Sequence, residues 1–224
     1  MYNLGLLYEE GNGVPKSYKK AVKLYQKPAD MENANAMYRL GRLYAMGNGV
    51  NQNYEKAVEL FQKAVELGNA EATNYLGWLY KEGKGVILNY EKAVELYQKA
   101  INLGNADAMN GLGVLYKNGY GVEQSYEKAA ELFQKAADLG DENGTYNLGL
   151  LYETGKGVSQ NYEKATELYL KATEIGSRDS MYRLGWLYEN GKLGKVDREK
   201  ALEWYQKAAD AGYEAAISKV DSLK

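Results

Sequence analysis

Hydrophobic positions along the chain repeat with a fixed step of 36 residues. Leu-Gly pairs mark this step, and they begin at Leu4, Leu40, Leu76, Leu112, Leu148 and Leu184. A tyrosine stands three residues after each of these glycines. A period of this length, kept without an insertion, predicts a solenoid in which copies of one small unit stack on each other.

Each copy carries the pattern of two amphipathic helices. In the copy that spans 69–104, apolar residues recur at steps of three and four over 70–82 and again over 90–100, as on one helical face. Gly83 ends the first helix and Gly104 the second, because glycine accepts the left-handed conformation of a helix C-terminus. The chain is therefore predicted to be all-α, built from helix pairs.

Polar and small residues at fixed slots refine this prediction. Before each second helix stands a residue suited to accept a hydrogen bond from a free backbone N–H, namely Ser17, Asn53, Asn89, Ser125, Asn161 and Asp197. A glycine inside a helix costs about 1 kcal/mol relative to alanine. Its repetition predicts close contact between paired helices at Gly5, Gly41, Gly77, Gly113, Gly149 and Gly185. One turn earlier, small residues indicate the same close packing at Ala36, Ala72, Ala108, Gly144 and Ser180.

The repeated sequence resembles a known family. Its elements are Ala-x-Ala-x-x-x-Leu-Gly-x-x-Tyr, Gly-x-Gly-Val, Tyr-Glu-Lys-Ala and Gln-Lys-Ala, and one copy reads Ala106-Asp107-Ala108, Leu112-Gly113, Tyr116, Gly119-Tyr120-Gly121-Val122, Tyr126-Glu127-Lys128-Ala129 and Gln134-Lys135-Ala136. This pattern is similar to the Sel1-like repeat, a relative of the tetratricopeptide repeat, over nearly the whole chain. The resemblance implies a right-handed α-α superhelix of antiparallel helix pairs whose first helices line the inner surface. It also implies an adaptor or scaffold that holds other proteins.

The expected organisation is a single solenoid over 1–224 with about six helix pairs and a capping helix over 213–223. The first pair is truncated, because Met1 falls in mid-repeat, so the chain is consistent with a piece excised from a longer protein. The cap is expected to point its polar side chains to solvent, at Lys219, Asp221, Ser222 and Lys224.

Two repeats depart from the pattern. Pro28 replaces a repeat alanine, and proline inside a helix costs about 3 kcal/mol, so the first repeat is expected to kink or end early. The same repeat has Glu32 where the later copies have glycine. In the last repeat Leu193 and Gly194 replace the usual Gly-Val and Arg198 replaces tyrosine, which predicts a reshaped loop.

Composition narrows the possible functions. A formal net charge of -2 offers no general attraction for nucleic acid or anionic lipid, and no Lys/Arg stripe lines the variable slots. Cysteine and histidine are absent, which excludes disulfides, thiolate metal sites and Ser-His or Cys-His catalysis. No apolar run approaches the roughly 20 residues of a membrane span, and no signal peptide is visible. We expect no cofactor and no catalytic residue; the compartment stays open.

The best functional lead is a stripe of variable slots on the first helices. The slot two residues before each repeat leucine varies between tyrosine and asparagine, and the slots one turn away on either side vary as well. Aromatic residues, asparagine and arginine are typical of contact surfaces. The candidate binding residues are Tyr38, Arg42, Glu71, Asn74, Trp78, Asp107, Asn110, Val114, Tyr146, Leu150, Tyr182 and Trp186. By resemblance to tetratricopeptide domains, this stripe faces the concave groove; alternatively, its aromatics merely pack between neighbouring first helices.

Three functions remain open. The first is a non-enzymatic module that holds an extended peptide or a partner protein in the groove, as a monomer. The second is a structural spacer or self-assembling segment with an empty groove. The third is a hydrolase that works with carboxylates alone, for which Glu71 and Asp107 are the residues to vary.

Overall fold

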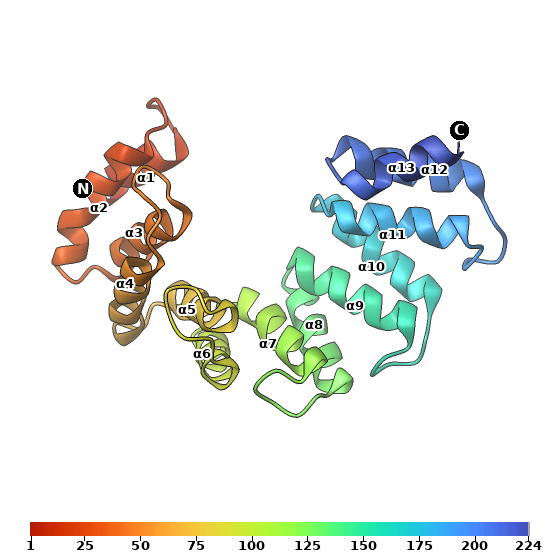
Figure 1. The fold of residues 1–224 in the computed structure, drawn as a ribbon, viewed down its shortest axis with the longest axis horizontal. Coiled ribbons are helices and arrows are strands. Elements are labelled where there is room, and N and C mark those ends of the chain that lie inside the picture. Colours follow the sequence, from red (N-terminus) through yellow and green to blue (C-terminus); the bar gives the residue numbers. More distant parts are fainter. Residues whose placement is uncertain (224) are drawn as a thin grey trace. The chain divides into compact units, whose positions relative to one another are not determined.

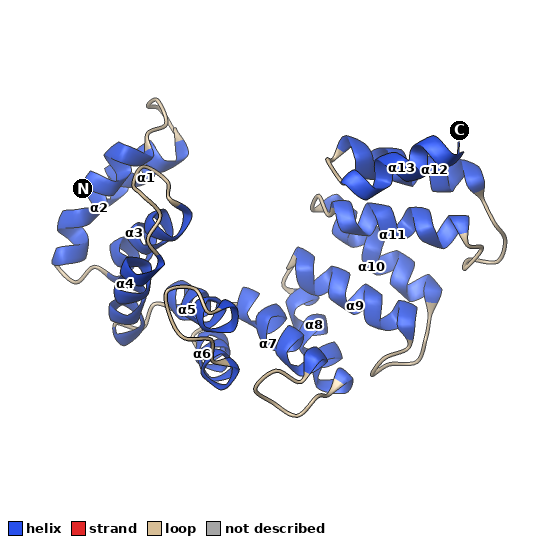
Figure 2. Ribbon diagram, viewed as in Figure 1, coloured by secondary structure: helices blue, strands red, loops and turns tan. Residues whose placement is uncertain are grey.

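The computed structural model describes residues 1–223 of the chain, and over these residues it contains thirteen α-helices and no strand (Figure 2). The helices are α1 (Tyr2–Glu10), α2 (Tyr18–Asp30), α3 (Ala34–Met46), α4 (Tyr54–Glu66), α5 (Ala70–Glu82), α6 (Tyr90–Asn102), α7 (Asp107–Asn118), α8 (Tyr126–Asp138), α9 (Glu142–Thr154), α10 (Tyr162–Glu174), α11 (Arg178–Glu189), α12 (Arg198–Asp210) and α13 (Glu214–Leu223). The predicted all-helical solenoid of paired repeats is confirmed. We number the repeats by their helix pairs, from α1–α2 as the first to α11–α12 as the sixth.

The helices form two compact units (Figure 1). The N-terminal unit comprises Met1–Leu115 with Tyr120–Glu123, and the C-terminal unit comprises Tyr116–Gly119 with the described residues from Gln124 onward. Within the N-terminal unit each helix from α1 to α6 packs against the next one along the chain, and the same holds from α8 to α13 in the C-terminal unit. None of the described helices is long and apolar enough to cross a membrane.

Side-chain caps begin the second helices, as the sequence predicts. The Oδ1 atom of Asn53 accepts a hydrogen bond of 2.7 Å from the backbone N–H of Lys56, and Asn161 caps α10 in the same way. Side-chain caps of this kind are present on all six second helices. Each cap satisfies an N–H group that has no partner within the helix. The caps therefore fix where each second helix begins.

The predicted close approach of paired helices is confirmed at five of the repeat glycines, namely Gly5, Gly41, Gly77, Gly149 and Gly185. A Cβ atom placed on Gly41 in α3 would lie only 2.7 Å from Cε1 of Phe61 in α4. The corresponding distances from Gly5, Gly149 and Gly185 to the aromatic ring of their own second helix are 2.5–2.7 Å. Carbon atoms at van der Waals contact lie ≈ 3.5–4.0 Å apart, so only glycine leaves room for these rings.

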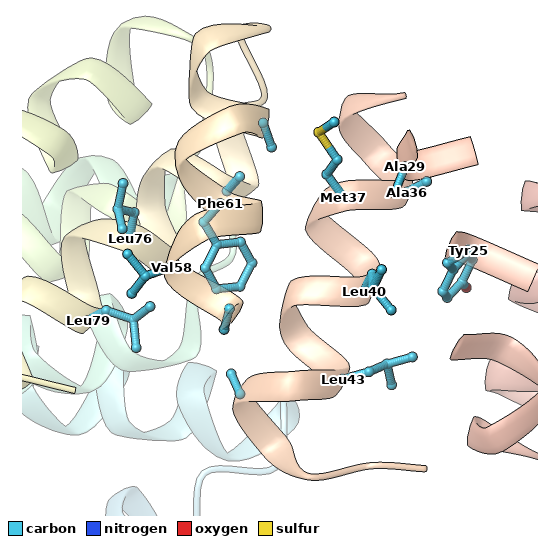
Figure 3. Packing of buried hydrophobic residues seen from close by; sticks show 14 of the residues in the cluster. Tyr25, Ala29, Ala36, Met37, Leu40, Leu43, Val58, Phe61, Leu76 and Leu79 are labelled. Carbon is cyan, nitrogen blue, oxygen red and sulfur yellow. The ribbon is translucent and has the colours of Figure 1, made fainter. Parts of the chain in front are cut away.

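The aromatic rings that occupy these glycine sites also form the centre of the core. Figure 3 shows Leu40 and Leu43 on the side of α3 that faces Tyr25, while Phe61 lies on the opposite side of the same helix. Tyr25, Phe61 and Leu40 are all completely buried. One helix thus packs against aromatic rings of its own repeat and of the preceding repeat, and this shared core joins neighbouring repeats.

The expectation that Pro28 shortens the first repeat is wrong. Helix α2 runs to Asp30 and has the same 13 residues as the other second helices. Pro28 lies in its last turn, where only one backbone hydrogen bond is lost, and the N–H groups of Met31 and Asn33 bond to the Pro28 carbonyl oxygen. The backbone of the first repeat is unusual at Glu32 instead, because this residue has a φ of 59° at a position where the other repeats have glycine.

The loop of the last repeat is reshaped, as predicted. Gly49, Gly85, Gly121 and Gly157 lie against the backbone of the tyrosine that begins the preceding second helix. The next position of this series is Leu193, and Gly194, in place of the repeat valine, has a φ of 111° and no atom near its Cβ position.

The capping helix begins at Glu214, and one expectation about it is wrong. Lys219 does not point freely to solvent, because its Nζ atom lies 2.8 Å from Oε2 of Glu189. Lys224 lies outside the described residues.

Candidate functional site

The candidate stripe on the first helices lies at the boundary between core and solvent. Ten of its twelve residues are partly buried, and the two carboxylates Glu71 and Asp107 are exposed. Fully buried positions, such as Leu76 and Leu79, alternate with them along α5. The stripe is therefore accessible at its outer edge, while its inner edge contacts the core. Whether it binds a ligand remains a prediction.

The stripe tyrosines have a packing role that the sequence did not separate from binding. The ring of Tyr38 lies 6.1 Å from that of Phe61, and Tyr146 lies 5.9 Å from Tyr169. Tyr182 stacks in the same way on the core tyrosine of its repeat, Tyr205, at 5.2 Å. These rings contribute to the core, so their loss affects stability as well as any binding.

Trp78 and Arg42 are placed differently from these tyrosines. Trp78 meets the edge of Tyr75 at 5.8 Å, and the ammonium of Lys84 lies 4.5 Å from the centre of the indole ring. The guanidinium of Arg42 lies 5.8 Å from the Tyr38 ring. Trp78 therefore contacts Tyr75 of its own helix and Lys84 in the loop after α5, and its ring does not pair with the core ring of its repeat.

A charged triad joins repeats, and sequence reasoning missed it. The hydroxyl of Tyr25 in α2 donates a hydrogen bond of 2.6 Å to Oε2 of Glu9 in α1, and Arg39 of α3 lies 3.5 Å from Oε1 of the same carboxylate. We call this arrangement the Tyr–Glu–base triad. It recurs in the fifth and sixth repeats as Tyr169, Glu153 and Arg183, and as Tyr205, Glu189 and Lys219. The base comes from the next repeat in the first two of these triads and from the capping helix α13 in the third, so each triad stabilises the contact of a repeat with the element that follows it.

Burial controls the charges of the triads. Burial raises the pKa of the Tyr169 hydroxyl far above its ordinary value, and the negative charge of Glu153 raises it further. Burial alone would raise the pKa of Glu189, but hydrogen bonds from Lys219 and Tyr205 outweigh it and lower the pKa. At neutral pH each triad tyrosine is therefore a protonated donor, and Glu189 is a charged acceptor.

Two repeats lack the triad and fill its place without a buried carboxylate. In the second repeat Phe61 stands in place of the tyrosine, and its ring lies 5.3 Å from Tyr75 at the base position. In the fourth repeat Phe133 is accompanied by Lys117, whose Nζ atom donates to Oδ1 of Asn147 at 3.5 Å. Burial lowers the pKa of Lys117, and the nearby charge of Lys156 lowers it further. Phenylalanine brings no hydroxyl, so no acceptor is needed.

The third repeat has the tyrosine of the triad but neither the glutamate nor the base. It keeps the tyrosine, Tyr97, but Lys81 occupies the position of the glutamate and Gly111 the position of the base. A Cβ atom on Gly111 would lie 2.7 Å from Cε1 and Cζ of Tyr97, so the tyrosine ring leans toward the glycine. Within the described chain, the Tyr97 hydroxyl has no hydrogen-bond partner, although the residue is only 3% exposed.

A cavity of about 300 Å³ opens at this place in the N-terminal unit. Five residues of the candidate stripe line it, namely Asn74, Trp78, Asp107, Asn110 and Val114. The remaining lining residues are Tyr75, Lys81, Tyr97 and Gly111, which the sequence analysis did not single out as binding residues. Residues of helices α5, α6 and α7 thus line one hollow with aromatic walls and polar groups.

The other candidates are not gathered in this cavity. Tyr38, Arg42 and Glu71 do not line it. In the C-terminal unit Tyr146, Leu150 and Trp186 pack against one core cluster, and Tyr182 packs against the next. Among the described residues no group of three or more acidic side chains is arranged to hold a metal ion.

The helix pairs, the capped second helices and the shared aromatic core define an α-helical repeat protein of the solenoid class. The profile of the Sel1 repeat matches residues 1–33, 34–69, 70–105, 106–141, 143–177 and 178–213. The chain therefore belongs to the Sel1 repeat family, as its sequence pattern indicates.

Solved structures support this assignment. A Sel1 repeat protein from Oxalobacter formigenes is 34% identical, with 94% of this chain and 86% of that chain covered and a TM-score of 0.86. The protein c5321, described as a protective antigen of uropathogenic Escherichia coli with an SLR fold, is 37% identical over 99% of this chain, with a TM-score of 0.78. The chain spans 48% of that E. coli protein. A search of curated proteins found no match.

A more distant structure shares the fold alone. Immunity protein Pa5087 from Pseudomonas aeruginosa is 23% identical, with 94% of this chain and 80% of that chain covered and a TM-score of 0.64.

Proposed function

We propose that this chain is a non-enzymatic binding module whose first helices hold a peptide segment or a partner protein. The single observation that carries this proposal is the cavity of about 300 Å³ in which five residues of the variable stripe come together. Aromatic walls with a few polar groups are typical of sites that accept side chains of a partner. The cavity lies on the stripe that varies between repeats, where the core does not dictate the residue type.

The chemistry of the stripe fits a protein partner. Asn74 carries an amide group that can bond to the backbone of an extended segment, and Trp78 offers a large apolar surface. Sequence composition adds support, because a chain without histidine or cysteine lacks the commonest catalytic bases and nucleophile pairs.

Affinity capture with matched variants tests the proposal. The intact chain is immobilised, exposed to extract of the cells that produce it, and compared with Trp78→Ala and with Glu91→Ala, which removes an exposed side chain of α6. We expect a defined protein to be retained by the intact chain and by Glu91→Ala and lost with Trp78→Ala. The helical circular dichroism of all three proteins should be equal. Equal retention by Trp78→Ala would contradict the proposal.

A further inference from the structure

Tyr97 of the third repeat lines a cavity, and its hydroxyl has no acceptor within the described chain. In the first, fifth and sixth repeats the corresponding tyrosine donates to a glutamate at 2.6 Å. Tyr97 is almost as buried as those tyrosines, yet no described residue accepts from its hydroxyl. A ligand that places an acceptor in the cavity can therefore accept this hydrogen bond, as the glutamates do in the triads.

The residue at the glutamate position of the triads is positively charged in the third repeat. Lys81 stands where the triads have glutamate, and it lines the same cavity as Tyr97. The base that pairs with the glutamate elsewhere is missing, because Gly111 has no side chain. The third repeat thus has a positive charge where the triads have a negative one, and the ring of Tyr97 lies against Gly111 where the triads have a basic side chain.

We propose that this cavity binds the carboxylate of an acidic side chain in an extended partner segment, with the Tyr97 hydroxyl and the Lys81 ammonium as donors. The ligand carboxylate enters the cavity that Tyr97, Lys81 and Gly111 line together. This inference rests on the proposed function and adds the chemistry of the partner.

Two neighbouring carboxylates bear on the charge balance. Glu82 forms an ion pair of 2.8 Å with Lys81, but both side chains are partly exposed, at 38% and 24%, and exposed ion pairs contribute little to stability. A ligand carboxylate can therefore replace Glu82 at little cost. Asp107 also lines the cavity, and it is exposed to solvent, which screens its repulsion.

The alternative occupant is a basic side chain that pairs with Asp107. It would take the place of the missing base, as Arg39 and Arg183 do in their triads. It would meet the charge of Lys81, however, and would bring no acceptor for Tyr97. The observations therefore favour an acidic side chain, and a basic one is an outcome that the experiment distinguishes.

Three seven-residue peptides test the inference, identical except for glutamate, glutamine or lysine at the centre. Each is titrated into the isotope-labelled chain while NMR follows the Gly111 amide and the Trp78 indole N–H. We expect the glutamate peptide to shift both signals to saturation and to bind at least tenfold more tightly than the other two. Lys81→Gln should remove this preference.

The chain supplies its own control variants. Lys117 is the corresponding lysine of the fourth repeat, where Asn147 occupies the base position, so Lys117→Gln should leave peptide binding unchanged. The double variant Lys81→Glu/Gly111→Arg rebuilds a triad and should abolish binding. The Tyr97 ring has room to move away from position 111 and toward Gly77. A Cβ on Gly77 would lie 3.1 Å from this ring, whereas the distance from the corresponding glycine to its ring is 2.5–2.7 Å in four other repeats.

The outcomes separate this inference from the proposed function. Tighter binding of the lysine peptide, or equal binding of all three peptides, would overturn the carboxylate site while leaving the stripe as a binding surface. Loss of the glutamate preference in Lys117→Gln but not in Lys81→Gln would also overturn it. If no peptide shifts either signal, the carboxylate site is rejected, and the capture experiment with Trp78→Ala decides the proposed function separately.

Discussion

The hydroxyl of Tyr169 in α10 donates a hydrogen bond of 2.6 Å to Oε2 of Glu153 in α9, and both side chains are buried. Arg183 of the next repeat approaches the same carboxylate at 3.4 Å. This pair connects the two helices of the fifth repeat and, through the arginine, the fifth repeat to the sixth. Its counterpart in the third repeat, Tyr97, has lost both partners.

Removal of the tyrosine hydroxyl should therefore cost stability only where an acceptor is present. We expect Tyr169→Phe to lower the free energy of unfolding by about 1–3 kcal/mol, because it leaves the buried Glu153 with one donor fewer. Tyr97→Phe should cost less than about 0.5 kcal/mol, since its hydroxyl has no partner to lose. Urea denaturation followed by circular dichroism measures both. A larger loss in Tyr97→Phe would contradict the description of the third repeat.

The close-approach glycines should tolerate a methyl group unequally. A Cβ on Gly41 would lie 2.7 Å from the Phe61 ring, whereas on Gly77 it would lie 3.1 Å from Tyr97. We expect Gly41→Ala to destabilise the chain by about 1–2 kcal/mol, because overpacking exceeds the gain in helix propensity. Gly77→Ala should be nearly neutral. Thermal unfolding of the two variants ranks them, and the opposite order would show that the rings adjust freely.

Glu32 should be a site where glycine stabilises the chain. Its φ of 59° is a conformation that costs a side-chain-bearing residue about 1 kcal/mol. We expect Glu32→Gly to raise the free energy of unfolding by a few tenths to about 1 kcal/mol, the gain being reduced by the greater freedom of the unfolded chain. Glu66→Gly, within helix α4, should be destabilising. A destabilising Glu32→Gly would show that the backbone there is not strained.

The last repeat should lose stability in acid. Hydrogen bonds from Lys219 and Tyr205 hold the pKa of Glu189 below its ordinary value of 4.5 in the folded chain. A carboxyl group with a lowered folded pKa contributes stability that is fully present above its unfolded pKa and is lost as the pH falls through the folded pKa. We expect unfolding between pH 7 and pH 3 to become less pH-dependent in Lys219→Gln. An unchanged pH profile would contradict the role of this ion pair.

The repeat architecture could be predicted well from the sequence because the same residue types recur at the same positions of each copy. Six aligned copies reveal the helix faces, the capping residues and the glycine contacts, since each slot has the same environment in every repeat. Pro28 was misjudged because the cost of proline depends on its distance from the helix end, and α2 ends only two residues later.

The site was predicted only in part, for a physical reason. The variable stripe was visible, but the cavity depends on which tyrosine ring leans toward which helix, a matter of tenths of an ångström. The triads were visible in principle. Glutamate follows the repeat tyrosine at Glu9, Glu153 and Glu189, which are the repeats with a core tyrosine and with Arg39, Arg183 or Lys219 thirty residues after the glutamate. Comparison of slots across different repeats would have revealed this covariation and the exception at Tyr97.

The most direct test of the central claim is site-specific photo-crosslinking in the cells that produce the chain. A photoreactive amino acid is placed at position 78 on the stripe, and in a second protein at position 91 on the exposed face of α6. The account predicts one defined protein adduct at position 78, absent at position 91 and abolished by the double variant Lys81→Glu/Gly111→Arg. Identical adducts at both positions, or an adduct at position 91 alone, would contradict a binding surface on the first helices.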